Sequence, residues 1–244
     1  MIVSRIEDVD VTSGAILLVD KPLRWTSFDV VKKLKYEIQR QSGCKKFKIG
    51  HAGTLDPLAT GLLIVCVGKY TKQIPEIQQQ QKHYEGTFTI GATTTSYDLE
   101  KIPENFMPYS HISKDEIMSV VNKFTGVIQQ YPPIFSAVKV NGKRAFEYAR
   151  DEKEITLQAK EVNIYSFDIT RVELPEIDFR IICSKGTYIR SIARDFGNVL
   201  NCGAYLSQLR RSKIGDFSVE NAFDMTPFIN NNRDENRKRR GFDL

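Results

Sequence analysis

The segment Gly50–Lys72, "GHAGTLDPLATGLLIVCVGKYTK", places a glycine-rich polar loop directly before an apolar run. Residues 62–68, "LLIVCVG", are rich in β-branched side chains and too short for a typical helix, so they predict a buried strand. Glycines surround Asp56, and Pro57 fixes the backbone directly after it. The loop can therefore hold one carboxylate with little freedom, as loops on rigid scaffolds do at catalytic sites. A purely structural Asp-Pro turn is the alternative.

The residues before this loop predict a strand followed by a helix. Residues 15–20, "AILLVD", form an apolar run typical of a buried strand. Thr26 or Ser27 can cap a helix that Gly43 ends. Four apolar residues recur at helical spacing and are expected to face inward: Phe28, Val31, Leu34 and Ile38.

The residues after the loop alternate between strand and helix signals. The segment 83–91 alternates in polarity and predicts a half-exposed strand, and Ser113 with Glu116 forms a capping box for a helix. Asn141-Gly142 is a hairpin signal, before a short helix to Asp151. Residues 155–183 predict strands and 186–200 a helix. Because these elements do not follow a regular βαβ repeat, the expected class is α+β, with a mixed, mainly antiparallel sheet.

Composition excludes several protein classes. The 244 residues are 41% hydrophobic, which suffices for one large core or for a main domain with a small appendage, and the longest apolar runs are too short to span a membrane. The N-terminus lacks the pattern of a secretory signal, so a cytoplasmic location is expected. The four cysteines and three histidines are scattered, so no metal site is predicted.

The net charge of +5 is distributed in clusters that could contact a nucleic acid, although basic runs are also common on solvated faces. The clusters comprise Lys45, Lys46 and Lys48; Lys139, Lys143 and Arg144; and Arg210, Arg211 and Lys213. Residues 229–244 are polar and basic, and we expect a disordered tail there.

Two further segments carry candidate site residues. Tyr188 and Arg190 stand where a helix is expected to begin, a position whose free backbone N–H groups can bind a phosphate. Arg190 could equally be a surface cation. Tyr84 on its strand could pack in the core or serve as a platform for a nucleobase.

At these segments the chain resembles the TruB family of tRNA pseudouridine synthases. The loop "GHAGTLDPLATGLLIVCVGKYTK" resembles the family's signature, and other motifs follow in the family's order over most of residues 14–222. They are "ILLVDKPLRWTSFDVV", "KHYEGTFTIG", "PPIFSAVKVNGKRAFEYAR" and "CSKGTYIRSIARDFGNVLNCGAYLSQLRR".

The resemblance implies a pseudouridine synthase fold and an enzyme that isomerises uridine 55 in the T loop of tRNA without cofactor or metal. It assigns Asp56 as the catalytic nucleophile, Tyr84 to stacking on the target base, and Arg190 to pairing with Asp56. Three more residues would bind the substrate: His51, Tyr188 and Leu209. The expected contacts to the RNA backbone are Lys139, Lys143, Arg144, Arg210 and Arg211.

The resemblance also implies an organisation and partners. Residues 1–228 would form the catalytic domain, with an RNA-contacting insertion at about 128–152, as in a short bacterial form without a C-terminal PUA domain. The expected partner is the T stem-loop of tRNA, with no guide RNA and no membrane, and the expected state is a monomer. A tRNA-binding folding chaperone with secondary catalysis and a guide-dependent ribonucleoprotein subunit are the alternatives.

One departure from the family pattern concerns the end of the tyrosine strand. Many members have a Thr-Asp-Thr cluster after "RLG", whereas this chain reads "TIGATTTSYDLE". Thr89 replaces the arginine, and Asp98 is the first acidic residue that follows. The sequence therefore assigns no role to this segment.

Overall fold

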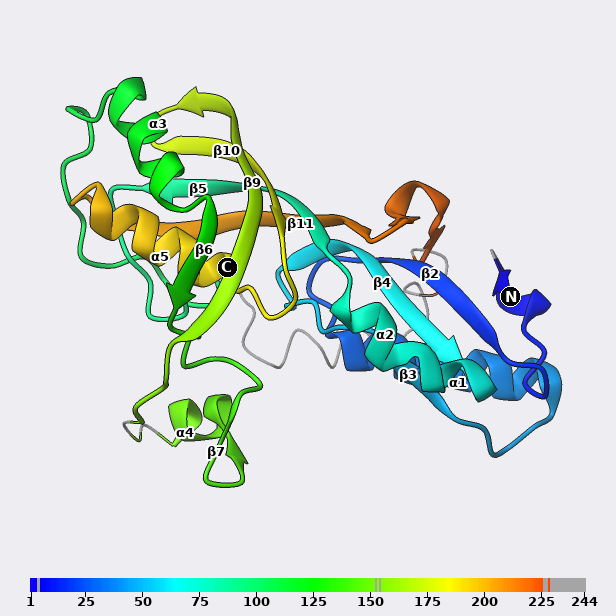
Figure 1. Cartoon of the computed structure of the whole chain (residues 1–244). Coiled ribbons are helices and arrows are strands. Elements are labelled where there is room, and N and C mark those ends of the chain that lie inside the picture. Colours follow the sequence, from blue (N-terminus) through cyan, green and yellow to red (C-terminus); the bar gives the residue numbers. More distant parts are fainter. Residues whose placement is uncertain (4, 152, 154, 226–227, 229–244) are drawn as a thin grey trace. The chain divides into compact units, whose positions relative to one another are not determined.

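The computed structural model describes the chain except residues 4, 152, 154, 226–227 and 229–244 (Figure 1). The predicted tail at 229–244 lies outside the described residues. Contacts divide the chain into two compact units, Met1–Tyr84 with Arg210–Leu244 (unit 1) and Glu85–Leu209 (unit 2).

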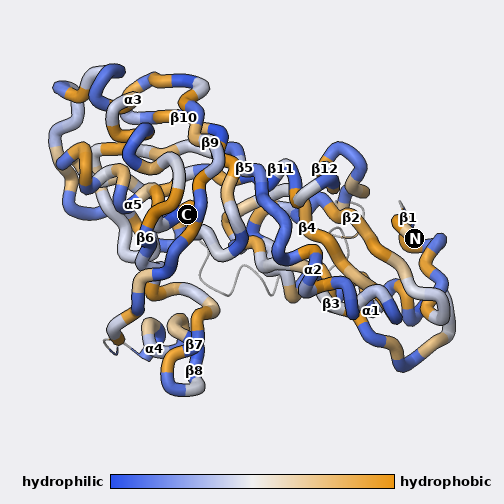
Figure 2. The backbone as a smooth tube through the Cα atoms, in the orientation of Figure 1, coloured by the Kyte–Doolittle hydropathy of each residue, from blue (hydrophilic) through white to orange (hydrophobic). Residues whose placement is uncertain are grey.

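The sheet of unit 1 is built on two long antiparallel strands. β2 (Ala15–Lys21) pairs with β4 (Ala59–Val67), so that Ala15 lies opposite Val67 and Lys21 opposite Gly61. Both strands are almost entirely buried, and Figure 2 shows their apolar colouring along most of their length. The shorter strands of this unit are β1 (Ile2–Val3), β3 (Ile49–His51), β12 (Phe217–Ser218), β13 (Phe223–Asp224) and the end of β11 (Ala204–Ile214).

Both ends of helix α1 (Ser27–Ser42) are fixed by local signals that the sequence contains. The Thr26 side chain accepts a hydrogen bond from the backbone N–H of Asp29, whose carboxylate bonds back to Thr26, and Gly43 adopts a left-handed φ of 68°. The buried face of α1 packs on the sheet through Val30, Leu34 and Ile38. The prediction that Phe28 faces inward is wrong, because the stripe is centred on residues 30, 34 and 38 and leaves Phe28 70% exposed.

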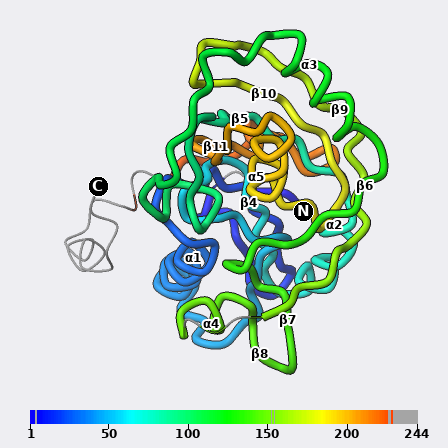
Figure 3. The backbone as a smooth tube through the Cα atoms, turned by 90° about the vertical axis from the view of Figure 1, so that its left-hand side faces the viewer, coloured from blue at the N-terminus to red at the C-terminus, as the bar shows by residue number. Residues whose placement is uncertain are grey.

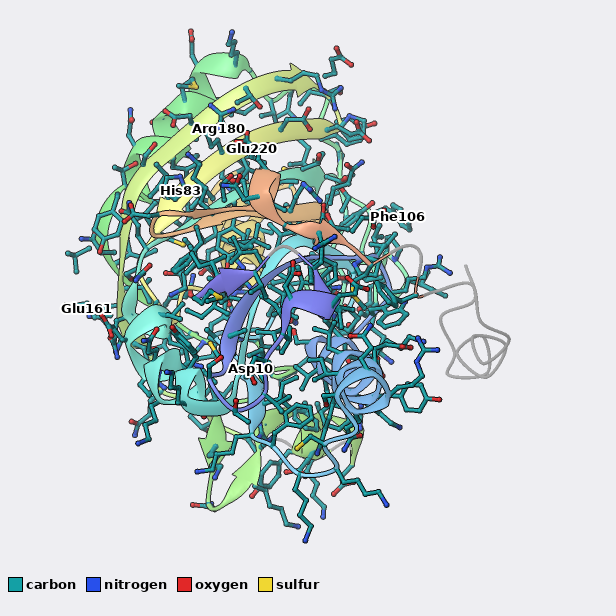
Figure 4. The ribbon with its side chains drawn as sticks, turned by 90° about the vertical axis from the view of Figure 1, so that its right-hand side faces the viewer. Asp10, His83, Phe106, Glu161, Arg180 and Glu220 are labelled. Carbon is teal, nitrogen blue, oxygen red and sulfur yellow. The ribbon has the colours of Figure 1, made fainter. Side chains whose placement is uncertain are left out.

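Short elements complete unit 1. A 3₁₀ helix, η2 (Gly68–Gln73), leads from β4 into α2 (Ile74–Gln79), and η1 (Ile6–Asp8) and η3 (Val219–Asn221) lie near the ends of the described chain. Asp10, labelled in Figure 4, accepts hydrogen bonds from the backbone and hydroxyl of Thr12 and so closes the turn before β2. These bonds lower the pKa of Asp10 to about 2, so this turn keeps its charged acceptor at neutral pH.

In the described part of unit 2, three helices accompany a mainly antiparallel sheet. Its strands follow the order β11-β5-β10-β9-β6, where β9 pairs antiparallel with both β10 and β6. Figure 3 shows β10, β9 and β6 curving around α5. The bounds are β5 (Lys82–Ile90), β6 (Gly126–Gln130), β9 (Lys160–Glu173), β10 (Glu176–Cys183), α3 (Lys114–Lys123) and α5 (Ile189–Val199).

Aromatic side chains form the centre of unit 2. Phe196 of α5 lies with its ring centroid 5.4 Å from that of Phe88 and 6.2 Å from that of Phe167. Phe179 packs 4.2 Å from Phe88. Offset and edge contacts of this kind add to the apolar area that the rings bury, so α5 is held firmly on the sheet.

The segment 128–152 contains the predicted hairpin and helix. β7 (Lys139–Val140) and β8 (Lys143–Arg144) pair across Asn141 and Gly142, whose φ angles are 49° and 84°. Positive φ at both positions is the geometry that Asn-Gly favours. α4 (Ala145–Arg150) follows directly.

The observed architecture confirms the predicted α+β class with a mixed, mainly antiparallel sheet, in which β1 and β13 run parallel to β2 whereas β4 runs antiparallel to it. Among the described residues, no helix is long and apolar enough to cross a membrane. The same part of the chain contains no group of three or more potential metal-ligating side chains.

A substitution at Gly61 tests the close packing of β4 against β11. Its φ is +101°, and a Cβ there would lie 2.3 Å from the backbone oxygen of Arg211. We expect Gly61→Ala to lower the free energy of unfolding by about 3 kcal/mol or more, because the backbone of β11 must move. Gly43→Ala is the control, since its φ is +68° but nothing lies within 4 Å. It should cost only about 1–2 kcal/mol. Equal losses in urea denaturation would contradict this packing.

Candidate active site in the loop before β4

Asp56 lies in the loop that joins β3 to β4 and is half-buried. Its carbonyl accepts the backbone N–H of Ala59 at 3.1 Å, which closes the Pro57–Leu58 turn and starts β4. The short turn fixes the backbone immediately after the carboxylate. The residues on both sides of Asp56 are in turn held by buried polar side chains of unit 1.

Ser27, the first residue of α1, holds the residue before Asp56. Its hydroxyl accepts the Leu55 N–H at 2.8 Å and donates to the Leu55 carbonyl at 3.1 Å. Both residues are 3% exposed, so water does not compete for these bonds. One side chain thus satisfies both backbone groups of Leu55.

Arg211 holds the start of the loop, which contradicts the prediction that it contacts RNA phosphates. The side chain is 1% exposed. Its guanidinium donates to the carbonyls of Gly53, Thr54 and Leu62 at 3.1, 3.2 and 2.9 Å. The sequence pattern of adjacent arginines could not show this, because residues on a strand alternate between faces and Arg211 is the inward one.

Lys21 holds the residue after Asp56. It is fully buried at the end of β2, and its Nζ donates to the carbonyls of Trp25 at 2.6 Å, Pro22 at 2.9 Å and Pro57 at 3.3 Å. The backbone N–H of Arg24 also donates to the Pro57 carbonyl, at 2.8 Å. Pro57 is therefore fixed from two sides.

The electrostatics of unit 1 link these buried groups to Asp56. Burial lowers the pKa of Lys21 to about 7, while the negative charge of Asp56 opposes this effect and favours the ammonium form. Burial and the positive charge of Arg211 lower the pKa of His51, which lies at the end of β3. The His51 ring is therefore neutral at neutral pH.

Tyr84 lies on β5 and is the last residue of the segment Met1–Tyr84 of unit 1. It is 8% exposed and therefore lies on the buried side of this strand. Its burial fits the core-packing alternative, and its assignment to base stacking stays a prediction.

Arg190 belongs to α5 in unit 2. Its contacts there give a role to the segment around Asp98, to which the sequence assigned none. Its Nε lies 3.6 Å from an Asp98 carboxylate oxygen, and both side chains are 5% exposed. Its terminal nitrogens donate to the carbonyls of Ser96 at 3.3 Å and Phe135 at 2.9 Å. The surface-cation alternative is therefore wrong. Pairing of Arg190 with Asp56 stays a prediction.

The turn that presents Asp98 to Arg190 has a strained backbone. Tyr97 adopts a φ of +63°, which places the Ser96 carbonyl and the Asp98 carboxylate on the same guanidinium. The Arg194 guanidinium lies 5.0 Å from the centre of the Tyr97 ring, one helical turn after Arg190. Two arginines of α5 thus contact one turn.

The other predicted substrate-binding residues of unit 2 have defined positions. Tyr188 is the N-cap of α5, and its backbone N–H and C=O both bond to the Gln130 amide, at 2.8 and 3.1 Å. The N–H of Tyr188 is therefore already used and cannot bind an anion. Leu209 lies on β11 and is 9% exposed. Their substrate contacts stay predictions.

The remaining basic candidates differ in exposure. Lys139, Lys143 and Arg144 are exposed around the hairpin of unit 2. Arg210 is 41% exposed and forms two hydrogen bonds with Asp20, at 2.6 and 3.0 Å. Its charge is thus partly neutralised, so the hairpin is the better phosphate-contacting segment.

Sequence reasoning missed three positioning residues: Lys21, Ser27 and Asp98. A signal existed for Lys21, because a lysine directly after a buried strand and before a proline has no obvious route to solvent. Ser27 was considered only as a helix cap, and Asp98 was identified as an acid without a function.

Ser27→Ala tests how the loop is held. It leaves the buried N–H and C=O of Leu55 without their partner, so the free energy of unfolding should fall by roughly 2–4 kcal/mol. Ser42→Ala is the control, because the Ser42 hydroxyl bonds the Ile38 carbonyl in the last, exposed turn of the same helix. It should change stability by no more than about 0.5 kcal/mol. Faster hydrogen exchange at the Leu55 amide would locate the effect, and equal stability of the two variants would contradict it.

Comparison of the chain with known proteins identifies its family. The model of the TruB family pseudouridylate synthase N-terminal domain matches residues 39–189, more than half of the chain. The tRNA pseudouridine synthase B of Flavobacterium johnsoniae is 56% identical over 216 residues, which cover 88% of this chain and 94% of that protein. The protein of the same name from Phocaeicola vulgatus is 49% identical over 215 residues, covering 88% and 92%.

A solved structure agrees with these relatives. The crystal structure of a Cbf5-Nop10-Gar1 complex contains a chain that is 27% identical, with a TM-score of 0.66 over 91% of this chain. This chain spans 55% of that one. The motif order, the fold and the relatives therefore agree, and the chain belongs to the TruB family of pseudouridylate synthases.

Proposed function

We propose that this chain isomerises uridine 55 in the T loop of tRNA to pseudouridine, with Asp56 as the reacting group. The observation that carries the proposal is the immobilised Asp56 loop. Buried side chains hold the loop residues on both sides of the carboxylate. The name of the relatives, tRNA pseudouridine synthase B, supplies the substrate class.

The reaction needs one group that assists cleavage of the glycosidic bond and stays in position while the base rotates. The bond between C1′ and N1 breaks, a bond between C1′ and C5 forms, N1 gains a proton and C5 loses one. A fixed carboxylate can act as nucleophile toward C1′ or C6, or remove a sugar proton. Each route requires Asp56 to be ionised and held in one orientation.

The target uridine must leave its stack before Asp56 can reach it. Extrusion costs a few kcal/mol, which stacking on an aromatic side chain can offset. We assign Tyr84 to this stacking and His51 to displacing the nucleotide. The lowered pKa of His51 supports this role, because a neutral ring is cheaper to insert among bases than a charged one.

Arg190 is proposed to pair with Asp56 and to favour its ionised form. Asp98 supports this role, because a buried guanidinium needs a carboxylate and carbonyl acceptors to stay in place. Tyr188 and Leu209 are proposed to line the uridine site. Phosphates of the T arm would bind at the exposed hairpin residues Lys139, Lys143 and Arg144.

The chain is proposed to act as a monomer on tRNA without guide RNA or cofactor. The name of the relatives, which specifies tRNA, supports tRNA as the substrate. This chain covers 94% and 92% of the length of two of these relatives. A tRNA-folding chaperone in which catalysis is secondary is the second candidate. The Asp56 environment favours catalysis, since folding of RNA would not require an immobilised carboxylate.

Tritium release from tRNA labelled at uridine C5 tests the function. Native protein alone, with unmodified tRNA and no other RNA, should release tritium. Asp56→Asn should reduce the rate by roughly 10³-fold, because the amide is neither a nucleophile nor a base. No release by native protein would sink the enzyme assignment. Equal release by the variant would sink only the role of Asp56.

Asp98→Asn tests the support of Arg190. The variant keeps the shape of the side chain but removes the charge that faces the buried guanidinium, so kcat should fall by roughly 10- to 100-fold while tRNA binding is retained. Asp195→Asn is the control, because Asp195 pairs at 2.7 Å with Arg194 of the same helix but is 32% exposed. It should leave kcat within about twofold. Unchanged kcat in Asp98→Asn would remove Asp98 from the site.

A further inference from the structure

Helix α1 presents an aromatic and basic stripe on the face opposite the sheet. Its members are spaced so that they lie on one side of the helix, within about a third of its circumference. Phe28 is 70% exposed, Tyr36 is 55% exposed, and Lys32 and Lys35 are also exposed. We call these four residues the α1 stripe.

The acidic residues of α1 do not neutralise this stripe. Asp29 is used in the capping box with Thr26. Glu37 is 4% exposed and pairs with Lys33 at 3.2 Å and Arg40 at 2.9 Å. Among the ion pairs of the described residues, none involves Lys32 or Lys35. The outer face is therefore positive.

A second basic segment is attached beside the stripe. The Gln39 side chain donates to the backbone carbonyl of Lys45 at 2.7 Å. This bond holds the segment 45–48, with exposed Lys45, Lys46 and Lys48, against the end of α1. The positive surface thus continues past the helix.

The stripe begins at the end of α1 that bonds the Asp56 loop. Ser27, which holds the Asp56 loop, directly precedes Phe28. The 16 residues of α1 extend about 24 Å at roughly 1.5 Å per residue. A molecule that follows the stripe therefore starts at the end of α1 that bonds the Asp56 loop and extends well beyond the size of one nucleotide.

We propose that the α1 stripe is a binding surface for the part of tRNA that flanks the target loop, which rests on the proposed function. Lys32 and Lys35 bind backbone phosphates, and Tyr36 packs its ring on a ribose or an unpaired base. Exposed aromatic rings between unpaired cations are suited to RNA, which offers both charges and flat apolar faces.

Helix α3 shows that this surface is not a general property of the chain's helices. Its exposed residues include Lys114 and Lys123 but also Asp115 and Glu116, so its outer face is nearly neutral. α3 therefore supplies a matched control, because two exposed lysines can also be replaced by neutral residues on this helix.

Removal of two charges tests the phosphate contacts. Lys32→Gln/Lys35→Gln should weaken binding of full-length tRNA roughly tenfold at about 0.15 M salt. The slope of log Kd against log salt should fall by about 0.7–0.9 for each lysine removed. Lys114→Gln/Lys123→Gln should change neither quantity. In both variants kcat at saturating tRNA should equal that of native protein, because no stripe lysine contacts the Asp56 loop in the described bonds.

Removal of an aromatic ring tests the stacking contact separately. Tyr36→Ala should weaken tRNA binding by roughly 5- to 100-fold with an unchanged salt slope, because stacking releases no counterions. Tyr165→Ala is the control, since Tyr165 of unit 2 is similarly exposed, at 52%. It should bind as native protein does.

Three results would overturn the proposal. Native affinity and salt slope in the Lys32/Lys35 variant would show that tRNA does not reach the stripe. Equal weakening in the α3 control would reduce the effect to net charge. If the Lys32→Gln/Lys35→Gln variant lost the binding to phosphatidylserine vesicles that native protein shows, but bound tRNA as native protein does, the partner would be a membrane surface. Binding is measured directly, so failure of isomerisation by native protein would be recorded separately.

Discussion

The position of the Asp56 carboxylate depends on backbone hydrogen bonds made by three buried polar side chains. Ser27 bonds both groups of Leu55, Arg211 bonds the two residues before it, and Lys21 bonds Pro57. An isolated loop of this kind would lose much conformational freedom to adopt one geometry. The side chains supply directional bonds where water is excluded, so alternative loop conformations leave buried groups unsatisfied and are disfavoured.

Use of buried cations for this purpose has an electrostatic consequence. A buried lysine or arginine is tolerated only where acceptors replace its water. In unit 1 those acceptors include the loop carbonyls of Gly53, Thr54 and Pro57, so the same bonds meet the requirements of the charge and of the backbone. The charges of Lys21 and Asp56 interact, and Arg211 together with burial lowers the pKa of His51. Support of the loop and tuning of its charges therefore cannot be separated.

Much of the fold was predictable from local signals. The caps at Thr26 and Ser113, the Asn141-Gly142 hairpin and the helix of Phe196 follow from patterns confined to a few residues. Phe28 was wrongly placed because the buried stripe runs through Val30, Leu34 and Ile38 and leaves the larger ring outside. Helical spacing allows two neighbouring stripes, and only contact with the sheet selects between them.

The site was less predictable than the fold, because its support comes from residues far apart in the sequence. Asp56 was identifiable from the density of glycines and from the family motif. Arg211 could not be distinguished from Arg210 by composition, although one points inward to carbonyls and the other pairs with Asp20. Asp98 likewise acquires a role only when Tyr97 adopts its unusual φ and turns the carboxylate to Arg190.

The two faces of α1 connect these observations. Its inner side begins with Ser27, which holds the Asp56 loop, and its outer side carries the exposed cations and rings. One helix therefore carries both the residue that bonds Leu55 and the exposed cations and rings. RNA seated on the outer face would thus be placed in a fixed relation to Asp56. Since the loop is already held before any RNA binds, the binding free energy can be used to extrude the uridine instead of ordering the protein.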